Sequence, residues 1–202
     1  MEGVVGQVII AMKGHPGTGK STLGRALAGA LKWPLIDKDD VRDCTAPLDQ
    51  QYSLPVSVLN DLSYQVIWSI ARTQLLLGLS LVLDSPLSRR AHLDRLLQLA
   101  SSSSGGARVF VVECIPQDQL QWRRRLQRRA ASDTASWHKP ATWQELETLV
   151  EGYGGSSDYD VGGVPKLVVN TTAAVGIEEL VSEILQFIVS HAGDRTESTD
   201  FE

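Results

Sequence analysis

The sequence predicts an α/β fold of three layers, in which helices cover both faces of a five-stranded parallel sheet. Short apolar runs alternate along the chain with segments of helical periodicity, which is the pattern of such folds. Each run is nearly continuous rather than alternating, as expected of strands buried on both faces. The runs cover residues 8–12, 35–36, 79–83, 109–112 and 167–169.

Helices are predicted between these runs. Apolar residues recur with helical spacing over residues 56–78 and again over residues 177–188. Thr142 and Glu145 form a capping-box pattern, which predicts a helix that continues to about Gly152. In the first of these helices we expect the core-facing residues to be Leu59, Leu62, Val66, Ile70 and Leu77.

Length and composition exclude several protein classes. A chain of 202 residues fits one domain, which we expect to span residues 1–190, followed by a flexible tail at 191–202. Its 43% hydrophobic and 21% charged residues exclude collagen-like, coiled-coil and wholly disordered proteins. The net charge of -5 argues against general nucleic-acid binding. We see no membrane span and no secretory or transit peptide, and the two distant cysteines suit a reducing compartment, so we expect a cytoplasmic protein.

The most specific motif lies at residues 14–21, which match the phosphate-binding pattern G-x-x-x-x-G-K-[ST] at every fixed position. An apolar run precedes the motif and a predicted helix at 22–31 follows it. Glycines let the backbone wrap around phosphate oxygens, and a helix N-terminus attracts their charge. Lys20 is expected to face solvent and reach the β- and γ-phosphates, and Ser21 to ligate Mg²⁺. The residues expected to contact ATP here are Gly14, His15, Pro16, Gly17, Thr18, Gly19, Lys20, Ser21 and Thr22.

The rest of the chain narrows the class of phosphate-loop protein. A GTPase would carry an N-K-x-D motif, and the sequence has none. A motor ATPase would usually have an acidic pair at the end of its metal-binding strand. Here the third run is followed by the single carboxylate of Asp84. These features favour a kinase.

With these motifs the sequence resembles the small P-loop kinases, which include the polynucleotide 5′-kinase, seryl-tRNA kinase, gluconate kinase and antibiotic phosphotransferase families. It is most similar to an ATP-binding kinase-like family described as an AAA-type P-loop domain. The resemblance rests on residues 14–21, on 37–42, on Asp84 and on the arginine-rich 122–129. It implies the strand order 2-3-1-4-5, a helical lid at about 122–153, and transfer of the γ-phosphoryl group of Mg²⁺-bound ATP to a hydroxyl. The acceptor would be a small or nucleotide-like molecule.

The segment D-D-V-R that begins at Asp39 looks like the D-D-x-R element of the polynucleotide-kinase-like members. By this resemblance Asp39 activates the acceptor hydroxyl as a base and Arg42 holds an acceptor anion. Asp37 ends the strand and is the rival base. Alternatively, the acidic stretch only caps a helix that begins near Val41. Asp84 would orient Mg²⁺-bound water or hold the acceptor, unless it only forms a turn.

Five arginines lie within residues 122–130 of this acidic chain. Arg125 and Arg129 are four positions apart, so they share a helix face and are expected to close on the phosphates as part of the lid. A solvated basic face is the alternative. His138 and Lys139, in the loop that follows, could contact the donor or the acceptor, or lie at the surface.

Asn170 ends the fifth run, where adenine usually rests in this fold, although a simple turn explains it equally well. Two functions compete with a small-molecule kinase. One is a regulatory module that binds and hydrolyses nucleoside triphosphates, and the other is a nucleic-acid 5′-end kinase, which the negative net charge disfavours. The identity of the acceptor and the oligomeric state stay open.

Overall fold

The computed structural model describes residues 6–103, 105–131 and 137–192. Its centre is a sheet of five parallel strands in the order β2-β3-β1-β4-β5, which confirms the predicted fold class and strand order. The strands are β1 (Gln7–Lys13), β2 (Leu35–Asp37), β3 (Leu81–Asp84), β4 (Ala107–Ile115) and β5 (Lys166–Asn170).

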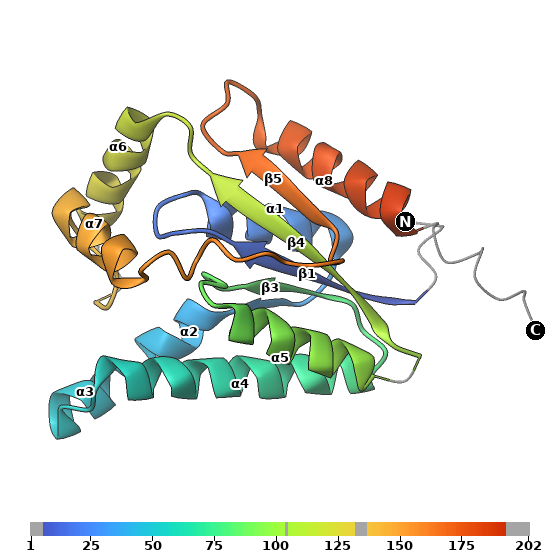
Figure 1. The fold of residues 1–202 in the computed structure, drawn as a ribbon, viewed down its shortest axis with the longest axis horizontal. Coiled ribbons are helices and arrows are strands. Elements are labelled where there is room, and N and C mark those ends of the chain that lie inside the picture. Colours follow the sequence, from blue (N-terminus) through green and yellow to red (C-terminus); the bar gives the residue numbers. More distant parts are fainter. Residues whose placement is uncertain (1–5, 104, 132–136, 193–202) are drawn as a thin grey trace, which may run out of the picture.

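Helices cover both faces of the sheet and complete the predicted three layers (Figure 1). On one face lie α1 (Lys20–Leu31) and α8 (Ile177–Ala192). On the other face lie α4 (Val56–Leu76) and α5 (Arg90–Ser101). The sheet is therefore shielded from solvent on both sides, as its continuous apolar strands require.

The strand β1 lies at the centre of the sheet, and its side chains pack into the hydrophobic cores on both faces of the sheet. Val8, Ile10 and Met12 face the core formed with α1 and α8, whereas Ile9 and Ala11 face the core formed with α4 and α5. All five side chains are fully buried. Burial on both faces stabilises this strand and so fixes the position of the loop that leaves its end.

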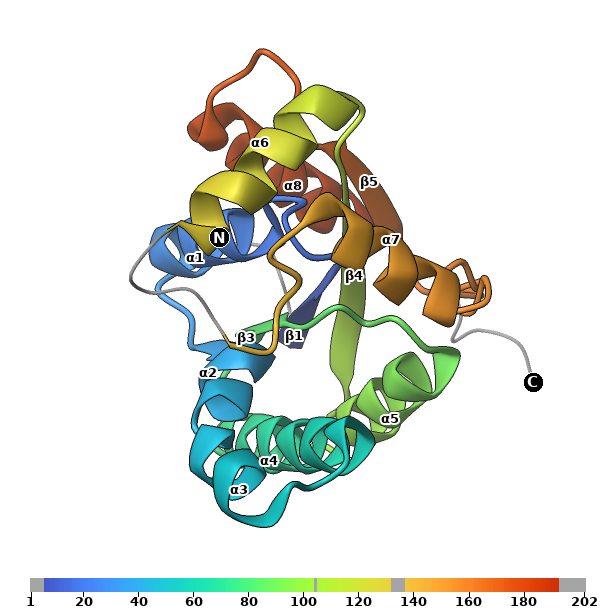
Figure 2. The ribbon, with the colours of Figure 1, turned by 90° about the vertical axis from the view of Figure 1, so that its left-hand side faces the viewer.

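The remaining helices lie towards the carboxyl edge of the strands, which Figure 2 views directly. In parallel α/β sheets, ligands bind at this edge. The predicted capping box at Thr142 and Glu145 is present at the start of one of these helices. The four helices are α2 (Lys38–Asp43), α3 (Ala46–Tyr52), α6 (Gln119–Ala130) and α7 (Trp143–Gly152).

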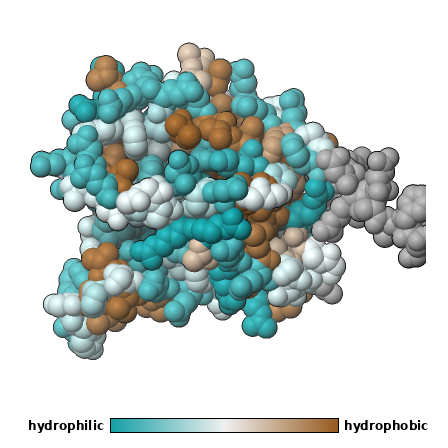
Figure 3. Space-filling view, in the orientation of Figure 1, coloured by the Kyte–Doolittle hydropathy of each residue, from teal (hydrophilic) through white to brown (hydrophobic). Residues whose placement is uncertain are grey.

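The prediction of which α4 residues face the core is largely wrong. Leu59 is buried as expected, but the buried stripe continues through Ser63, Ile67 and Ala71. The helix is apolar on most of its sides, so periodicity alone does not select one face. Ser63 can be buried because its hydroxyl donates to the Leu59 carbonyl over 2.7 Å. Apolar residues consequently reach the surface over α3 and the first turns of α4 (Figure 3). The expected core residues that are exposed are Leu62, Ile70 and Leu77.

The helix α8 extends through Ala192, so the first two residues of the predicted tail at 191–202 are helical. Residues 193–202 of that tail lie outside the described residues. Within the described ranges, no helix combines the length and the apolar character needed to cross a membrane.

Candidate functional site

The loop between β1 and α1 needs glycine at defined positions. Gly14, Gly17 and Gly19 have φ angles of 147°, 80° and 87°, a region that favours glycine. A Cβ atom on Gly14 would lie 2.8 Å from the carbonyl oxygen of Cys114, and one on Gly17 would lie 3.0 Å from Cδ2 of Leu126. These positions exclude other side chains and leave a backbone cradle, which fits the phosphate groups of a nucleotide.

Lys20 begins α1 and forms an ion pair with Asp84 at the end of β3. Its Nζ lies 2.6 Å from Oδ1 of Asp84, and both residues are buried, contrary to the expectation that Lys20 faces solvent. Burial alone would lower the pKa of Lys20, but attraction by the Asp84 carboxylate and the hydrogen bond to it outweigh burial and raise that pKa. Lys20 therefore stays charged.

The second carboxylate oxygen of Asp84, Oδ2, is buried and has no hydrogen-bond partner among the described residues. Buried carboxylate oxygens normally have a partner. Ser21, which follows Lys20, lines the cleft into which the phosphate loop opens. An Asp oxygen and a Ser hydroxyl near a phosphate cradle fit the donor set of Mg²⁺.

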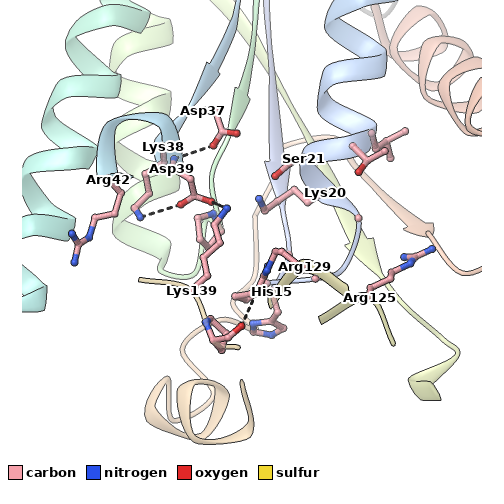
Figure 4. A pocket seen from close by; sticks show the side chains of 18 of the residues that line it. His15, Lys20, Ser21, Asp37, Lys38, Asp39, Arg42, Arg125, Arg129 and Lys139 are labelled. Atoms are coloured by element: carbon pink, nitrogen blue, oxygen red, sulfur yellow. Dashed lines mark hydrogen bonds and ion pairs between the residues drawn. The ribbon is translucent and has the colours of Figure 1, made fainter. Parts of the chain in front are cut away.

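The loop opens into a cleft of about 790 Å³, drawn in Figure 4. The walls are the phosphate loop, α2 and the residues 138–140 that join α6 to α7. Of the predicted site residues, all but Thr18, Asp84 and Asn170 line this cleft. The structure thus brings together the loop, the candidate bases and both predicted lid arginines.

Asn170 is not brought to the cleft. Its Oδ1 accepts hydrogen bonds from the backbone N–H of Thr172 (3.1 Å) and of Gln117 (3.3 Å). Its Nδ2 donates to Oε1 of Gln117 over 3.0 Å. Asn170 therefore ties the ends of β4 and β5 together, and its neighbour Thr171 reaches the cleft instead.

Asp37 both caps a helix and faces the site, the two roles that the sequence left as alternatives. It is the N-cap of α2, where its Oδ1 accepts from the backbone N–H of Asp39 over 2.9 Å. It also lines the cleft and is buried. Burial, and then the neighbouring Asp84, raise the pKa of Asp37 to about 6. A carboxylate of this kind can take up a proton near neutral pH.

Asp39 lies on the same side of the cleft as Asp37, but positively charged neighbours lower its pKa. Its Oδ2 is 2.7 Å from Nζ of Lys139, and its Oδ1 is 3.3 Å from Nε2 of His138. Burial would raise the pKa of Asp39, but His138, Lys139 and Lys38 outweigh burial and hold the pKa far below its usual range. Asp39 is therefore ionised in this arrangement.

Arg42 is fully buried on α2 and only partly hydrogen-bonded. Its Nη1 donates to Oγ1 of Thr45 over 2.6 Å, and its guanidinium lies 4.4 Å from the centroid of the Trp137 ring. Nε and Nη2 have no hydrogen-bond partner within the described residues. These two N–H groups form the edge of guanidinium that grips carboxylates and phosphates in a bidentate manner, so Arg42 can hold an anion.

The two predicted lid arginines make different contacts. Arg125 donates from Nη2 to the carbonyl oxygen of Thr171 (2.6 Å) and from Nη1 to its hydroxyl (3.2 Å). The Thr171 hydroxyl in turn donates to the carbonyl of Thr18 in the phosphate loop. Arg129 donates to the carbonyl of Pro140 over 2.8 Å. In Figure 4 the Arg125 side chain extends away from Lys20.

Sequence reasoning missed the contact between α6 and the phosphate loop. Nε1 of Trp122 donates to the carbonyl of Pro16 over 2.9 Å, and its ring stacks on His15 with centroids 6.5 Å apart. Leu126 fills the space beside Gly17. The signal was the spacing of Trp122 and Leu126, which places both on one helix face. The first two turns of α6 are thus fixed on the loop.

Comparison with known proteins agrees with this geometry. The model of a family described as AAA domain matches residues 9–152. No curated protein matches the chain in sequence. A proposed kinase from Chloroflexus aurantiacus has a similar fold, with a TM-score of 0.68 at 21% identity over 91% of this chain and 99% of that one. A gluconokinase from Sinorhizobium meliloti has a TM-score of 0.58 at 20% identity, covering 94% of each chain.

A third similar structure is Kti12 from Chaetomium thermophilum in complex with ADP-AlF3. Its TM-score is 0.63 at 16% identity, over 89% of this chain and 98% of that one. Likeness at these identities extends to the fold alone. Because the family model matches well over half of the residues, the chain belongs to the AAA domain family, and its fold is that of the P-loop kinases.

Proposed function

We propose that the protein is an ATP-dependent phosphotransferase whose acceptor is a small anionic molecule with a free hydroxyl group. The main support for this proposal is the buried Arg42, whose Nε and Nη2 have no hydrogen-bond partner among the described residues. Arg42 lines the same cleft as Asp39 and the phosphate loop. In this proposal residues 1–190 form one kinase domain and 122–153 contain its lid. ATP as donor suits a cytoplasmic location.

On the donor side, backbone amides of the phosphate loop bind the β- and γ-phosphates, and Lys20 neutralises charge on the transferring group. Ser21 and Asp84 would hold Mg²⁺, which supplies further charge neutralisation when it is bound. Arg129, a lid residue in this proposal, lines the cleft and can add to this neutralisation. Such transfers depend on positioning and charge more than on covalent chemistry.

On the acceptor side, Arg42 would grip the carboxylate or phosphate of the acceptor and so orient its hydroxyl. Asp39 would accept a hydrogen bond from that hydroxyl and take its proton late in the transfer. Asp37 remains the rival base, because its raised pKa suits proton uptake near neutral pH. Asp39→Asn and Asp37→Asn distinguish the two carboxylates, because only loss of the true base should slow the transfer by orders of magnitude.

The test is an acceptor screen that measures ADP release from ATP and Mg²⁺. Hydroxy acids, sugar acids and phosphorylated alcohols should stimulate release, whereas neutral polyols of equal size should not. Arg42→Gln should raise the acceptor KM by about tenfold to a hundredfold, because charge-assisted hydrogen bonds contribute about 1.5–3 kcal/mol. The ATP KM should stay nearly constant.

Two results would contradict this proposal. ADP release that no acceptor changes would favour the alternative of a nucleotide-hydrolysing regulatory module. Stimulation by oligonucleotides with a 5′-hydroxyl, weakening steeply as salt is raised, would favour a nucleic-acid end kinase.

A further inference from the structure

Three consecutive residues after α6 contact the acceptor side of the cleft. The Trp137 ring covers the guanidinium of Arg42 at 4.4 Å. His138 and Lys139 approach the two carboxylate oxygens of Asp39, with Nε2 of His138 3.3 Å from Oδ1 and Nζ of Lys139 2.7 Å from Oδ2. Figure 4 shows Lys139 and Asp39 meeting across the cleft. The segment 137–139 therefore pairs with Asp39 and covers the guanidinium of Arg42, the two α2 groups that the proposed acceptor would use.

These contacts are shielded from solvent. The side-chain exposures of His138, Lys139 and Asp39 are 11%, 22% and 14%. Ion pairs of this kind are screened less by salt than pairs at an open surface. Lys38 also lies near Asp39, with its Nζ 3.7 Å from Oδ1, so that a lysine ammonium approaches each carboxylate oxygen. Such a carboxylate is a weak hydrogen-bond acceptor for a third molecule, since its charge is already neutralised.

We infer that Trp137, His138 and Lys139 form a latch that blocks Asp39 and Arg42 until an anionic acceptor displaces it. This inference rests on the proposed phosphotransferase function. The anionic group of the acceptor pairs with the free edge of Arg42, and its hydroxyl needs an oxygen of Asp39, so Lys139 and His138 must release that carboxylate. Water carries no anionic group and cannot compete for Arg42.

The latch thereby selects the acceptor and limits the hydrolysis of ATP by water. Lys139 acts as a positioning residue, because it controls the availability of Asp39 without contacting the transferring group in the latched state. The part of the lid that must move is small, since Trp122 and Leu126 fix the start of α6 on the phosphate loop.

Amide hydrogen exchange on the ligand-free full chain tests the latch without any catalytic turnover. Lys139→Met and Asp39→Asn should each speed amide exchange in α2 by at least about fivefold, because a shielded ion pair should match or exceed the strongest coupling measured for exposed pairs. The double variant should be no faster than either single one, because both remove the same contact. Lys139→Arg should restore protection, and the exposed Arg128→Met is the control that should change nothing.

Acceptor-free ADP release from ATP gives the second readout. Lys139→Met should raise it by about fivefold over the wild type, and Asp39→Asn added to Lys139→Met should remove the gain. The latch would be overturned if Lys139→Met left amide exchange in α2 unchanged. It would also be overturned if this variant exchanged faster but released ADP no faster, while the wild type still phosphorylated acceptors. If the exchange rates follow this pattern but no form of the protein shows acceptor-dependent turnover, the kinase proposal is overturned instead.

Discussion

Lys20 and Asp84 are joined by a buried ion pair, in which Nζ of the lysine lies 2.6 Å from Oδ1 of the aspartate. Parallel pairing of β1 with β3 sets Met12 beside Asp84, so the aspartate ends its strand next to the start of the phosphate loop. The lysine that should meet the phosphates is thus already oriented and charged. Because the ion pair is buried, removing either residue leaves the charge of the other without its partner.

We predict that Lys20→Met abolishes ATP turnover and also destabilises the fold. Loss of the ammonium leaves Asp84 as a buried charge without its partner, which costs about 3–5 kcal/mol. Urea unfolding measures the stability and ADP release measures the activity. Lys20→Met combined with Asp84→Asn should recover most of the stability and remain inactive. Wild-type turnover in the single variant would contradict the role of the loop.

We predict that Asp39→Asn lowers acceptor phosphorylation by about 10²–10⁴-fold, the range for loss of a general base. The ATP affinity should change little, because Asp39 lies on α2 and not in the phosphate loop. Transfer rates and ATP binding are measured on the same preparation. If Asp37→Asn has this effect and Asp39→Asn does not, Asp37 is the base.

The raised pKa of Asp37 predicts a pH dependence of stability. Its folded value of about 6 exceeds the usual value of 3.8, so the native state binds the proton more tightly. The resulting stabilisation is complete below about pH 4 and is lost as the pH rises through 6, with an upper limit of about 3 kcal/mol. Asp37→Asn keeps an N-cap residue and removes the charge. Its gain in unfolding free energy over the wild type should therefore grow between pH 4 and 7, and a gain independent of pH would contradict this account.

The sequence predicted the fold and the phosphate loop because both leave local signals. Continuous apolar runs mark the buried strands, and the glycine spacing of residues 14–21 marks the cradle. The latch left no such signal, since His138 and Asp39 are 99 positions apart. Arg125 and Arg129 were predicted from their spacing to share a helix face, and both line the cleft, but only the structure reveals Thr171 as the partner of Arg125.

We predict that Gly17→Ala weakens nucleotide binding and loosens α6. The new Cβ would lie 3.0 Å from Leu126 in a backbone with φ of 80°, so strain and contact act together. ATP affinity and thermal unfolding measure the effect. Gly29→Ala is the matched control, because Gly29 is exposed within α1 and has open space around its Cβ position. That control should stabilise the protein by up to about 1 kcal/mol. Equal behaviour of the two variants would contradict the packing of α6 on the loop.

We predict that the two lid arginines respond differently to substitution. Arg125→Ala loses two hydrogen bonds to Thr171 and should lower the free energy of unfolding by about 1.5–3 kcal/mol. It should also raise the ATP KM, because Thr171 holds the carbonyl of Thr18 in the phosphate loop. Among the described residues, Arg129 donates one hydrogen bond, to Pro140, so Arg129→Ala should leave stability nearly unchanged.

If Arg129 instead meets the transferring phosphoryl group, its loss should lower kcat by about 10²-fold with little change in the ATP KM, as for one lost charge-stabilising donor. Arg128→Ala, on the exposed side of α6, is the control for a general effect of lowering the helix charge. Unfolding curves, kcat and KM for the three variants distinguish these roles. Equal losses of kcat in Arg125→Ala and Arg129→Ala, without any loss of stability in the former, would mean that both arginines act on the phosphates and that the Thr171 contact is incidental.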